Sequence, residues 1–167
     1  MNKTVLVPTD FTIRSLNLLK SVLNRHQGEK INIILCHGFE FGSSVTDLLF
    51  YSKKRILSAL KTDEFEKALQ VIRNKYDSGI ESLRTEAFFG STHSAFANFI
   101  EGNKVDEAYS YVGYKPKFSH HASFDVAPYV LKLSDHHKIP YEGYEEEKAS
   151  YESFADLFFS KIAGYNR

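Results

Sequence analysis

Two histidine doublets are the residues of this sequence whose types point most directly to chemistry. His120 and His121 form one doublet, and His136 and His137 form the other. Imidazole nitrogens are common ligands of Zn²⁺ and Ni²⁺. Adjacent residues of an extended chain point to opposite sides, so each doublet offers one ligand, and no Cys or acidic residue stands beside them at a familiar spacing. We therefore expect these histidines to lie in solvated loops. The alternatives are a metal or small-molecule site, or a pocket that titrates near neutral pH.

The dipeptide Cys36-His37 stands at the end of an apolar run and offers a thiol and an imidazole. Cys36 lies among Ile and Leu residues, which predicts a core thiol rather than a nucleophile. His37 closes the run at the strand end where α/β folds place their ligands, so it is a candidate pocket residue. The sequence contains no Gly-x-Ser-x-Gly elbow, no Walker loop and no distinctive pair of carboxylates. These observations favour a protein that is not an enzyme, although the sequence leaves the question open.

The elements that position these residues follow from the spacing of the apolar side chains. Short apolar runs predict strands over 3–8, 30–37, 80–89 and 108–113, with a more polar candidate over 138–144. A 3.6-residue period predicts helices over 13–25, 45–61, 64–76, 92–101, 124–134 and 145–161. The strand, helix and strand within residues 3–37 form one βαβ unit, which predicts a parallel sheet with a right-handed crossover.

The order of these elements predicts a doubly wound α/β fold. The parallel sheet has five strands, or four and an irregular edge, because the candidate strand over 138–144 contains Pro140 and Gly143. No repeat, low-complexity tract or long linker divides the chain. We therefore expect one α/β domain over residues 1–144 and a helical extension over residues 145–167.

The overall composition excludes several classes of function. The 167 residues include 21 Lys and Arg and 21 Asp and Glu, so the protein has no net positive charge that would attract nucleic acid or an anionic membrane. One cysteine forbids an intrachain disulfide and is typical of a reducing compartment. The first residues do not resemble a signal peptide, and no apolar run is long enough to span a membrane. We expect a cytoplasmic protein with neither a nucleic acid nor a membrane as its partner.

The turn after the first predicted strand carries a family resemblance. Residues 3–12 end in Pro-Thr-Asp-Phe-Thr and lead into Ser15-Leu16-Asn17, and this opening resembles that of the universal stress protein (UspA) family. Weaker matches follow at Leu35-Cys36-His37, at residues 107–113, and at residues 123–132 and 137–140. The resemblance covers about residues 3–140 and is strongest over the first 37 residues.

The resemblance implies an adenine-nucleotide-α-hydrolase-like sheet of five parallel strands, a homodimer formed through the last strand and, in many members, bound ATP. The matching positions and the loop beside them supply the candidate cofactor-binding residues, which are Thr9, Asp10, His37, Gly113, Lys115 and Ser123. The family's phosphate loop is altered here: Pro116 replaces the second glycine, the third glycine is absent, and Asp125 would repel phosphate at the helix start. We therefore expect a binding or interaction module in stress response or signalling that is not a robust ATP binder. The alternative is an ATP-binding member with slow hydrolysis.

Aromatic residues are unusually frequent, with 14 Phe and 10 Tyr. Many belong to the core, but Phe158 and Phe159 are adjacent on the predicted terminal helix and cannot both face one core stripe. Terminal helices of this kind dock onto a partner subunit or cap a sheet edge. We expect residues 145–162 to complete the fold or the dimer, or to contact a protein partner.

Overall fold

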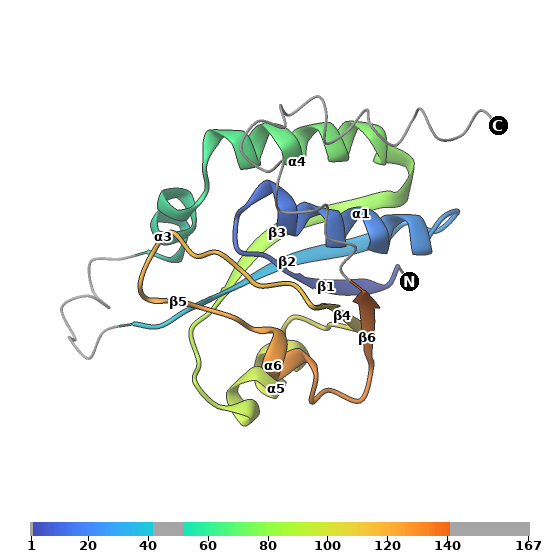
Figure 1. Ribbon diagram of the computed structural model, residues 1–167. Helices are drawn as coiled ribbons and strands as arrows, with labels where there is room; N and C mark the ends of the chain where they lie inside the picture. The colour runs from blue at the N-terminus through green and yellow to red at the C-terminus, as the bar shows by residue number, and fades with distance from the viewer. Residues whose placement is uncertain (1, 42–51, 141–167) are drawn as a thin grey trace.

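A computed structural model describes residues 2–41 and 52–140 of the chain and shows a twisted sheet between two layers of helices (Figure 1). The strand order is β3-β2-β1-β4-β6, and every neighbouring pair in this order is parallel. The strands are β1 Thr4–Pro8, β2 Ile31–Phe39, β3 Ile80–Phe88, β4 Glu107–Val112 and β6 His136–Pro140. A short sixth strand, β5 Ser123–Phe124, pairs antiparallel with β2. The predicted parallel sheet of five strands is therefore confirmed, with β5 as an addition.

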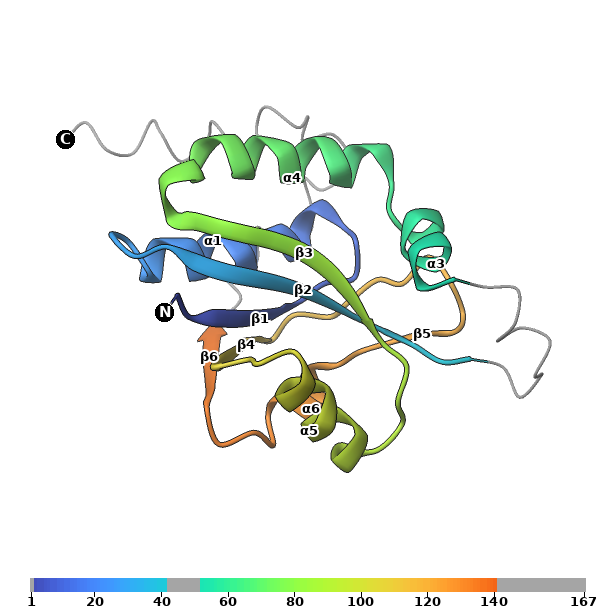
Figure 2. The same cartoon turned by 180° about the vertical axis from the view of Figure 1, so that it is seen from behind.

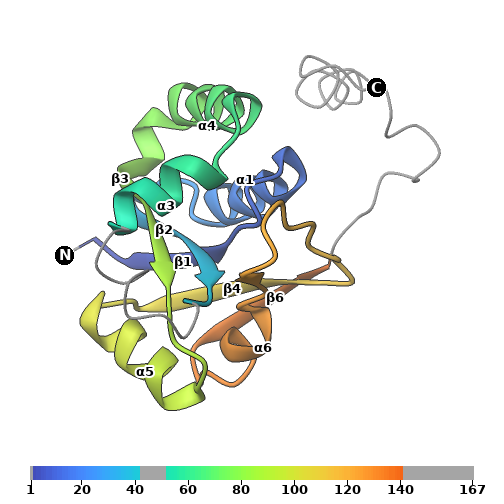
Figure 3. The ribbon, with the colours of Figure 1, turned by 90° about the vertical axis from the view of Figure 1, so that its left-hand side faces the viewer.

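Helices cover both faces of the sheet, as a doubly wound fold requires (Figure 3). The helical segments are η1 Ile13–Ser15, α1 Leu16–Arg25, α3 Lys53–Leu60, α4 Asp63–Lys75, η2 Asp77–Gly79, α5 His93–Gly102 and α6 Ala127–Val130. α1, α3 and α4 pack into one apolar cluster, whereas α5 and α6 belong to a second cluster across the sheet. Figure 2 shows the molecule from the side of β3 and α4.

The first βαβ unit forms for the reasons that its apolar pattern indicates. Val5, Leu6 and Val7 of β1 have no exposed surface, because side chains on alternating sides of the strand enter the two apolar clusters. The connection begins as the 3₁₀ turn η1, in which the Thr12 side chain accepts a hydrogen bond from the Ser15 amide. α1 then buries one face against the sheet, as the 3.6-residue period predicted.

The predicted helix over 124–134 is wrong in extent. Only Ala127–Val130 are helical, and Phe124 lies instead in β5, opposite Gly38 of β2. A Cβ at Gly38 would lie 2.5 Å from the Phe124 carbonyl oxygen, so glycine at this position permits the close approach of the two strands. Between β5 and the helix the Asp125 carboxylate accepts a hydrogen bond from the Ala127 amide in a local turn, and a proline stands in the first turn of the helix.

Two other predictions reach beyond the described part of the chain. The fifth strand begins at His136 and is described to Pro140, at the sheet edge that its proline predicted; residues 141–144 lie outside the described residues. The helix predicted over 45–61 is described only in part, as α3. The predicted C-terminal extension over 145–167 lies outside the described residues.

Candidate functional site

The turn that follows β1 is the centre of the candidate site. Phe11 adopts a left-handed backbone conformation with φ 61°, which costs a residue other than glycine about 1–3 kcal/mol. Two side chains of the same turn stabilise this shape: the Phe11 amide donates to Thr9 Oγ1 (3.1 Å), and the Thr12 amide donates to Asp10 Oδ1 (2.9 Å). The Phe11 ring stacks on His37 with a centroid separation of 4.5 Å. The turn is thus fixed by its own side chains and by β2.

The Asp10 carboxylate is fully used by hydrogen bonds within the protein. Thr12 donates to Oδ1 from both its amide and its hydroxyl, the latter at 2.6 Å. The Tyr114 hydroxyl and the Lys117 amide donate to Oδ2 at 2.6 and 2.8 Å. The residue is only 5% exposed. Because four donors surround this carboxylate, it has little capacity left to accept a hydrogen bond from a ligand.

The loop after β4 therefore crosses over the carboxyl end of β1. Gly113 begins this loop with φ 86°, a conformation that glycine adopts without strain. Tyr114, Pro116 and Phe118 then line the cavity beside Asp10. The volume of this cavity is about 60 Å³. Small-molecule sites commonly measure roughly 300–1,000 Å³, so this cavity is smaller than an ordinary small-molecule site.

His37 connects this turn to β5. Its Nδ1 lies 2.9 Å from the Thr9 carbonyl oxygen, which only accepts, so Nδ1 carries a proton. Its Nε2 lies 2.9 Å from Ser123 Oγ and accepts the hydroxyl proton when the ring is neutral. Burial lowers the pKa of His37, partly offset by the hydrogen bond to Thr9, and favours that neutral ring. His37 is therefore a buried histidine with both nitrogens satisfied.

The six residues proposed from the sequence are separated into two groups by the structure. Four of them are held by hydrogen bonds within the protein: Asp10 is bonded to Thr12 and to the loop after β4, and His37 connects Thr9 to Ser123. Gly113 and Lys115 lie on that loop and are exposed. Sequence reasoning missed Tyr114 and the Lys117 amide, the two groups that fasten the loop to Asp10. The aromatic residue directly after Gly113 was the only available signal, because a backbone donor leaves no trace in a sequence pattern.

The two histidine doublets lie at opposite ends of the sheet. His120 contacts the ring of Phe39 near the carboxyl end of β2, and its own ring stacks on His121 at 4.4 Å. His136 and His137 begin β6, where His136 Nδ1 lies 2.5 Å from the Leu133 carbonyl oxygen. Within residues 2–41 and 52–140, no group of three or more His, Cys, Asp and Glu side chains is placed to hold a metal ion. The structure thus does not bring the doublets together.

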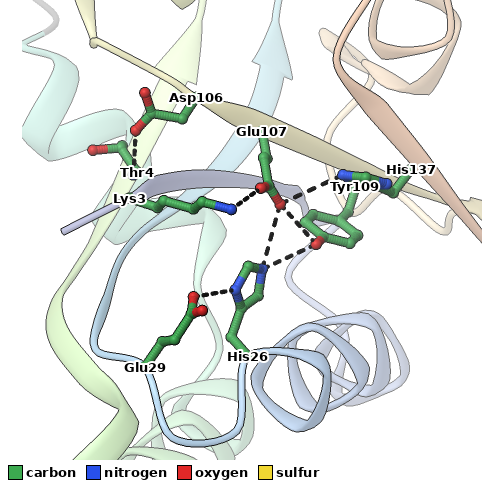
Figure 4. A network of polar contacts seen from close by, with 8 residues as sticks. All are labelled: Lys3, Thr4, His26, Glu29, Asp106, Glu107, Tyr109 and His137. Carbon is green, nitrogen blue, oxygen red and sulfur yellow. Dashed lines mark hydrogen bonds and ion pairs between the residues drawn. The ribbon is translucent and has the colours of Figure 1, made fainter.

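A second polar network lies at the amino end of the sheet and joins β1, β4, β6 and the end of α1 (Figure 4). Its centre is Glu107, whose carboxylate is contacted by Lys3, by the Tyr109 hydroxyl (3.0 Å), and by the rings of His26 (3.5 Å) and His137 (3.4 Å). Burial raises the pKa of Glu107, but the hydrogen bonds from Lys3 and Tyr109 outweigh it, and the pKa lies below its usual value. Burial and the Glu107 carboxylate raise the pKa of Tyr109. This network ties the edge strand β6 to the rest of the sheet.

Cys36 occupies the core position that the sequence predicted. It has no exposed surface, and burial raises the pKa of its thiol, so the reactive thiolate is disfavoured.

Comparison with known proteins supports the fold and nothing finer. No protein-family model and no curated protein matches the sequence. The structure of hypothetical protein MJ0577, solved for a structure-based assignment of biochemical function, matches with a TM-score of 0.53 and 20% identity and covers 86% of this chain and 99% of its own. Universal stress protein UspA from Lactobacillus plantarum matches with a TM-score of 0.50 and 15% identity over 83% of this chain and 96% of its own.

These observations define the class of protein first. The chain is a doubly wound α/β domain whose candidate site lies at the carboxyl ends of β1, β2 and β4. More narrowly, its fold is that of the universal stress proteins, as the opening motif predicted. Among the described helices, none is long and apolar enough to cross a membrane.

Proposed function

We propose that this chain is a binding or interaction module of the universal-stress-protein type, which acts in stress response or signalling and does not depend on bound ATP. The likeness of its fold to UspA from Lactobacillus plantarum supports a role of the universal-stress-protein type. The closed state of the Asp10 site supports a function that does not depend on ATP. In this proposal the chain recognises other molecules and carries out no reaction.

The hydrogen bonds of Asp10 are the single observation that carries the proposal. A carboxylate that serves a ligand keeps an oxygen accessible, whereas both oxygens of Asp10 are already occupied by Thr12, Tyr114 and Lys117. ATP binding at this position would break the two bonds to Oδ2 and displace the loop that makes them. Bonds to an ionised acceptor each contribute about 1.5–3 kcal/mol, so opening the site has a substantial energetic cost.

The side chains at the neighbouring helix start also disfavour an anion. Asp125 places a carboxylate next to the amides of α6, where a phosphate would otherwise bind. Pro116 contributes no N–H to the loop. α6 has only four residues, so its dipole is small.

The proposal also includes a homodimer, a cytoplasmic location and a protein partner for the aromatic C-terminal region. β6 is the edge strand of the described sheet, which suits pairing of two copies through the last strand as the family resemblance implies. The neutral overall charge is consistent with partners other than nucleic acid and membranes.

Native mass spectrometry of the freshly purified full chain tests the proposal. We expect the mass of the polypeptide, as monomer or dimer, without nucleotide. A retained ATP or ADP would contradict the proposal and favour the alternative, an ATP-binding protein with slow hydrolysis. Loss of such a nucleotide from the Asp10→Ala variant would assign it to this site.

A further inference from the structure

A larger cavity opens beside β5, on the side of the sheet that α5 and α6 cover. Its volume is about 430 Å³, within the range of roughly 300–1,000 Å³ that is usual for small-molecule sites. The described lining comes from Glu40 after β2, from residues 90, 91 and 93 between β3 and α5, and from residues 124, 125, 128 and 129. Three separate segments thus border this space, and two of the lining residues, Phe124 and Asp125, also line the smaller cavity beside Asp10.

One wall of the cavity is aromatic and is held in place. The Tyr129 ring packs against Phe124 with a centroid separation of 6.0 Å, and its hydroxyl donates to the Ser91 carbonyl oxygen at 3.2 Å. The ring of His93 lies 4.9 Å from the Tyr129 ring. These contacts fix the orientation of Tyr129 and leave an apolar surface beside the polar groups.

The same cavity carries two carboxylates. Asp125 is half-buried; its Oδ1 accepts the Ala127 amide at 2.9 Å, and no described residue donates to its Oδ2. Burial raises the pKa of Asp125, and the neighbouring Asp10 carboxylate raises it further. Glu40 is exposed, and its carboxylate forms no hydrogen bond or ion pair with a described residue. Among the described lining residues, only His93 is able to carry a positive charge.

We propose that this cavity binds an organic cation, an amine whose ammonium group pairs with Asp125 and Glu40 while its apolar body rests on Phe124 and Tyr129. The ammonium group supplies the donor that Asp125 Oδ2 lacks and offsets the repulsion from Asp10. Aromatic faces also attract cations. Anionic ligands are repelled by the two carboxylates, and the described side chains offer no third ligand for a metal ion. The cavity shares Phe124 and Asp125 with the smaller cavity beside Asp10, but amine binding here requires neither the presence nor the absence of ATP at Asp10.

Tyramine is a suitable probe because it joins one ammonium group to one aromatic ring, and 4-ethylphenol is its neutral counterpart. We expect tyramine to shift the backbone amide signals of Ser91, Asp125 and Tyr129 in ¹⁵N–¹H spectra of the full chain at pH 7. We expect 4-ethylphenol to bind more weakly by on the order of 25-fold, the combined contribution of two partly exposed ion pairs of about fivefold each. Added salt should weaken the binding of tyramine and leave that of 4-ethylphenol unchanged.

Three variants assign the effect to the carboxylates. Asp125→Asn keeps an oxygen for the Ala127 amide and removes the charge, and Glu40→Gln removes an exposed charge with no effect on the fold. Each should weaken tyramine binding by on the order of fivefold, whereas the exposed Asp135→Asn, beside β6, should not change it. Tyramine shifts at other residues, equal binding of 4-ethylphenol, or unchanged affinity of both Asp125→Asn and Glu40→Gln would overturn the proposal. If Asp125→Asn does not fold, Glu40→Gln decides alone.

Discussion

The Tyr114→Phe substitution removes one hydroxyl from the loop that closes the Asp10 site. That hydroxyl donates to Asp10 Oδ2 at 2.6 Å and lies 3.1 Å from Thr12 Oγ1. A hydrogen bond to an ionised acceptor contributes about 1.5–3 kcal/mol. Asp10 keeps its bonds from Thr12 and from the Lys117 amide, so the carboxylate is not left unpaired and the lower figure of about 1.5 kcal/mol applies.

Urea denaturation of the full chain, monitored by circular dichroism at pH 7, measures this loss as a lower transition midpoint. For a chain of this length, about 1.5 kcal/mol corresponds to a melting temperature lower by about 3–6 °C. Tyr129→Phe is the matched control, because its hydroxyl donates to a neutral carbonyl oxygen and should cost about 0.5–1 kcal/mol. Equal stability of Tyr114→Phe and the wild type, within about 0.3 kcal/mol, would refute the reasoning that the tyrosine fastens the loop.

Three further predictions concern other parts of the fold. Gly38→Ala should destabilise the protein by about 1–3 kcal/mol in urea denaturation, because the new Cβ would lie 2.5 Å from the Phe124 carbonyl oxygen. Gly102→Ala is the control: its Cβ would meet nothing within 4 Å, so it should be neutral or stabilising. Equal effects of the two variants would contradict the strand contact. Because burial lowers the pKa of His37, its neutral form contributes stability that is complete above the unfolded pKa of about 6.5 and is lost as pH falls below it. His37→Gln should therefore show a smaller loss of stability between pH 7 and pH 5 than the wild type, and an unchanged slope would refute this. The pKa of Glu107 is lowered in the folded protein, so its carboxylate contributes stability that is present above the ordinary carboxyl pKa and is lost as pH falls through the pKa of the folded state. Glu107→Gln should therefore cost about 1.5–3 kcal/mol at pH 7 and much less in acid. A loss of stability that does not depend on pH would count against the network.

The centre of the sheet could be predicted because β1 and β2 are apolar and largely buried, and an amphipathic helix separates them. The run from Thr4 to Pro8 and the helix after it have patterns that only one local structure satisfies, and both formed as predicted. The edge position of β6 also followed from one residue, Pro140, which cannot donate to a further strand.

β5 could not be predicted because its cause is a tertiary contact. A strand of two residues has no periodicity, and its pairing depends on the missing side chain of Gly38, more than eighty residues earlier in the sequence. The apolar residues after Phe124 therefore suggested a longer helix than the single turn that forms.

The position of the candidate site could be predicted, but the hydrogen bonds of its residues could not. The turn motif placed Asp10 and His37 at the carboxyl edge of the sheet, where the structure also has them, and their role in binding stays a prediction. Whether Asp10 faces a ligand or the protein depends on where the loop after β4 lies. That position follows from bonds made by Tyr114 and by a backbone amide, which residue types alone do not specify.

Isothermal titration calorimetry of ATP into the full chain tests the central claim most directly, because it measures whether the loop after β4 leaves room for a nucleotide. The closed Asp10 site predicts no saturable heat with ATP, with or without Mg²⁺, and none with Tyr114→Phe, in which the Lys117 amide still holds the loop. Saturable binding of ATP to the wild type with a micromolar Kd, abolished by Asp10→Ala, would contradict the account.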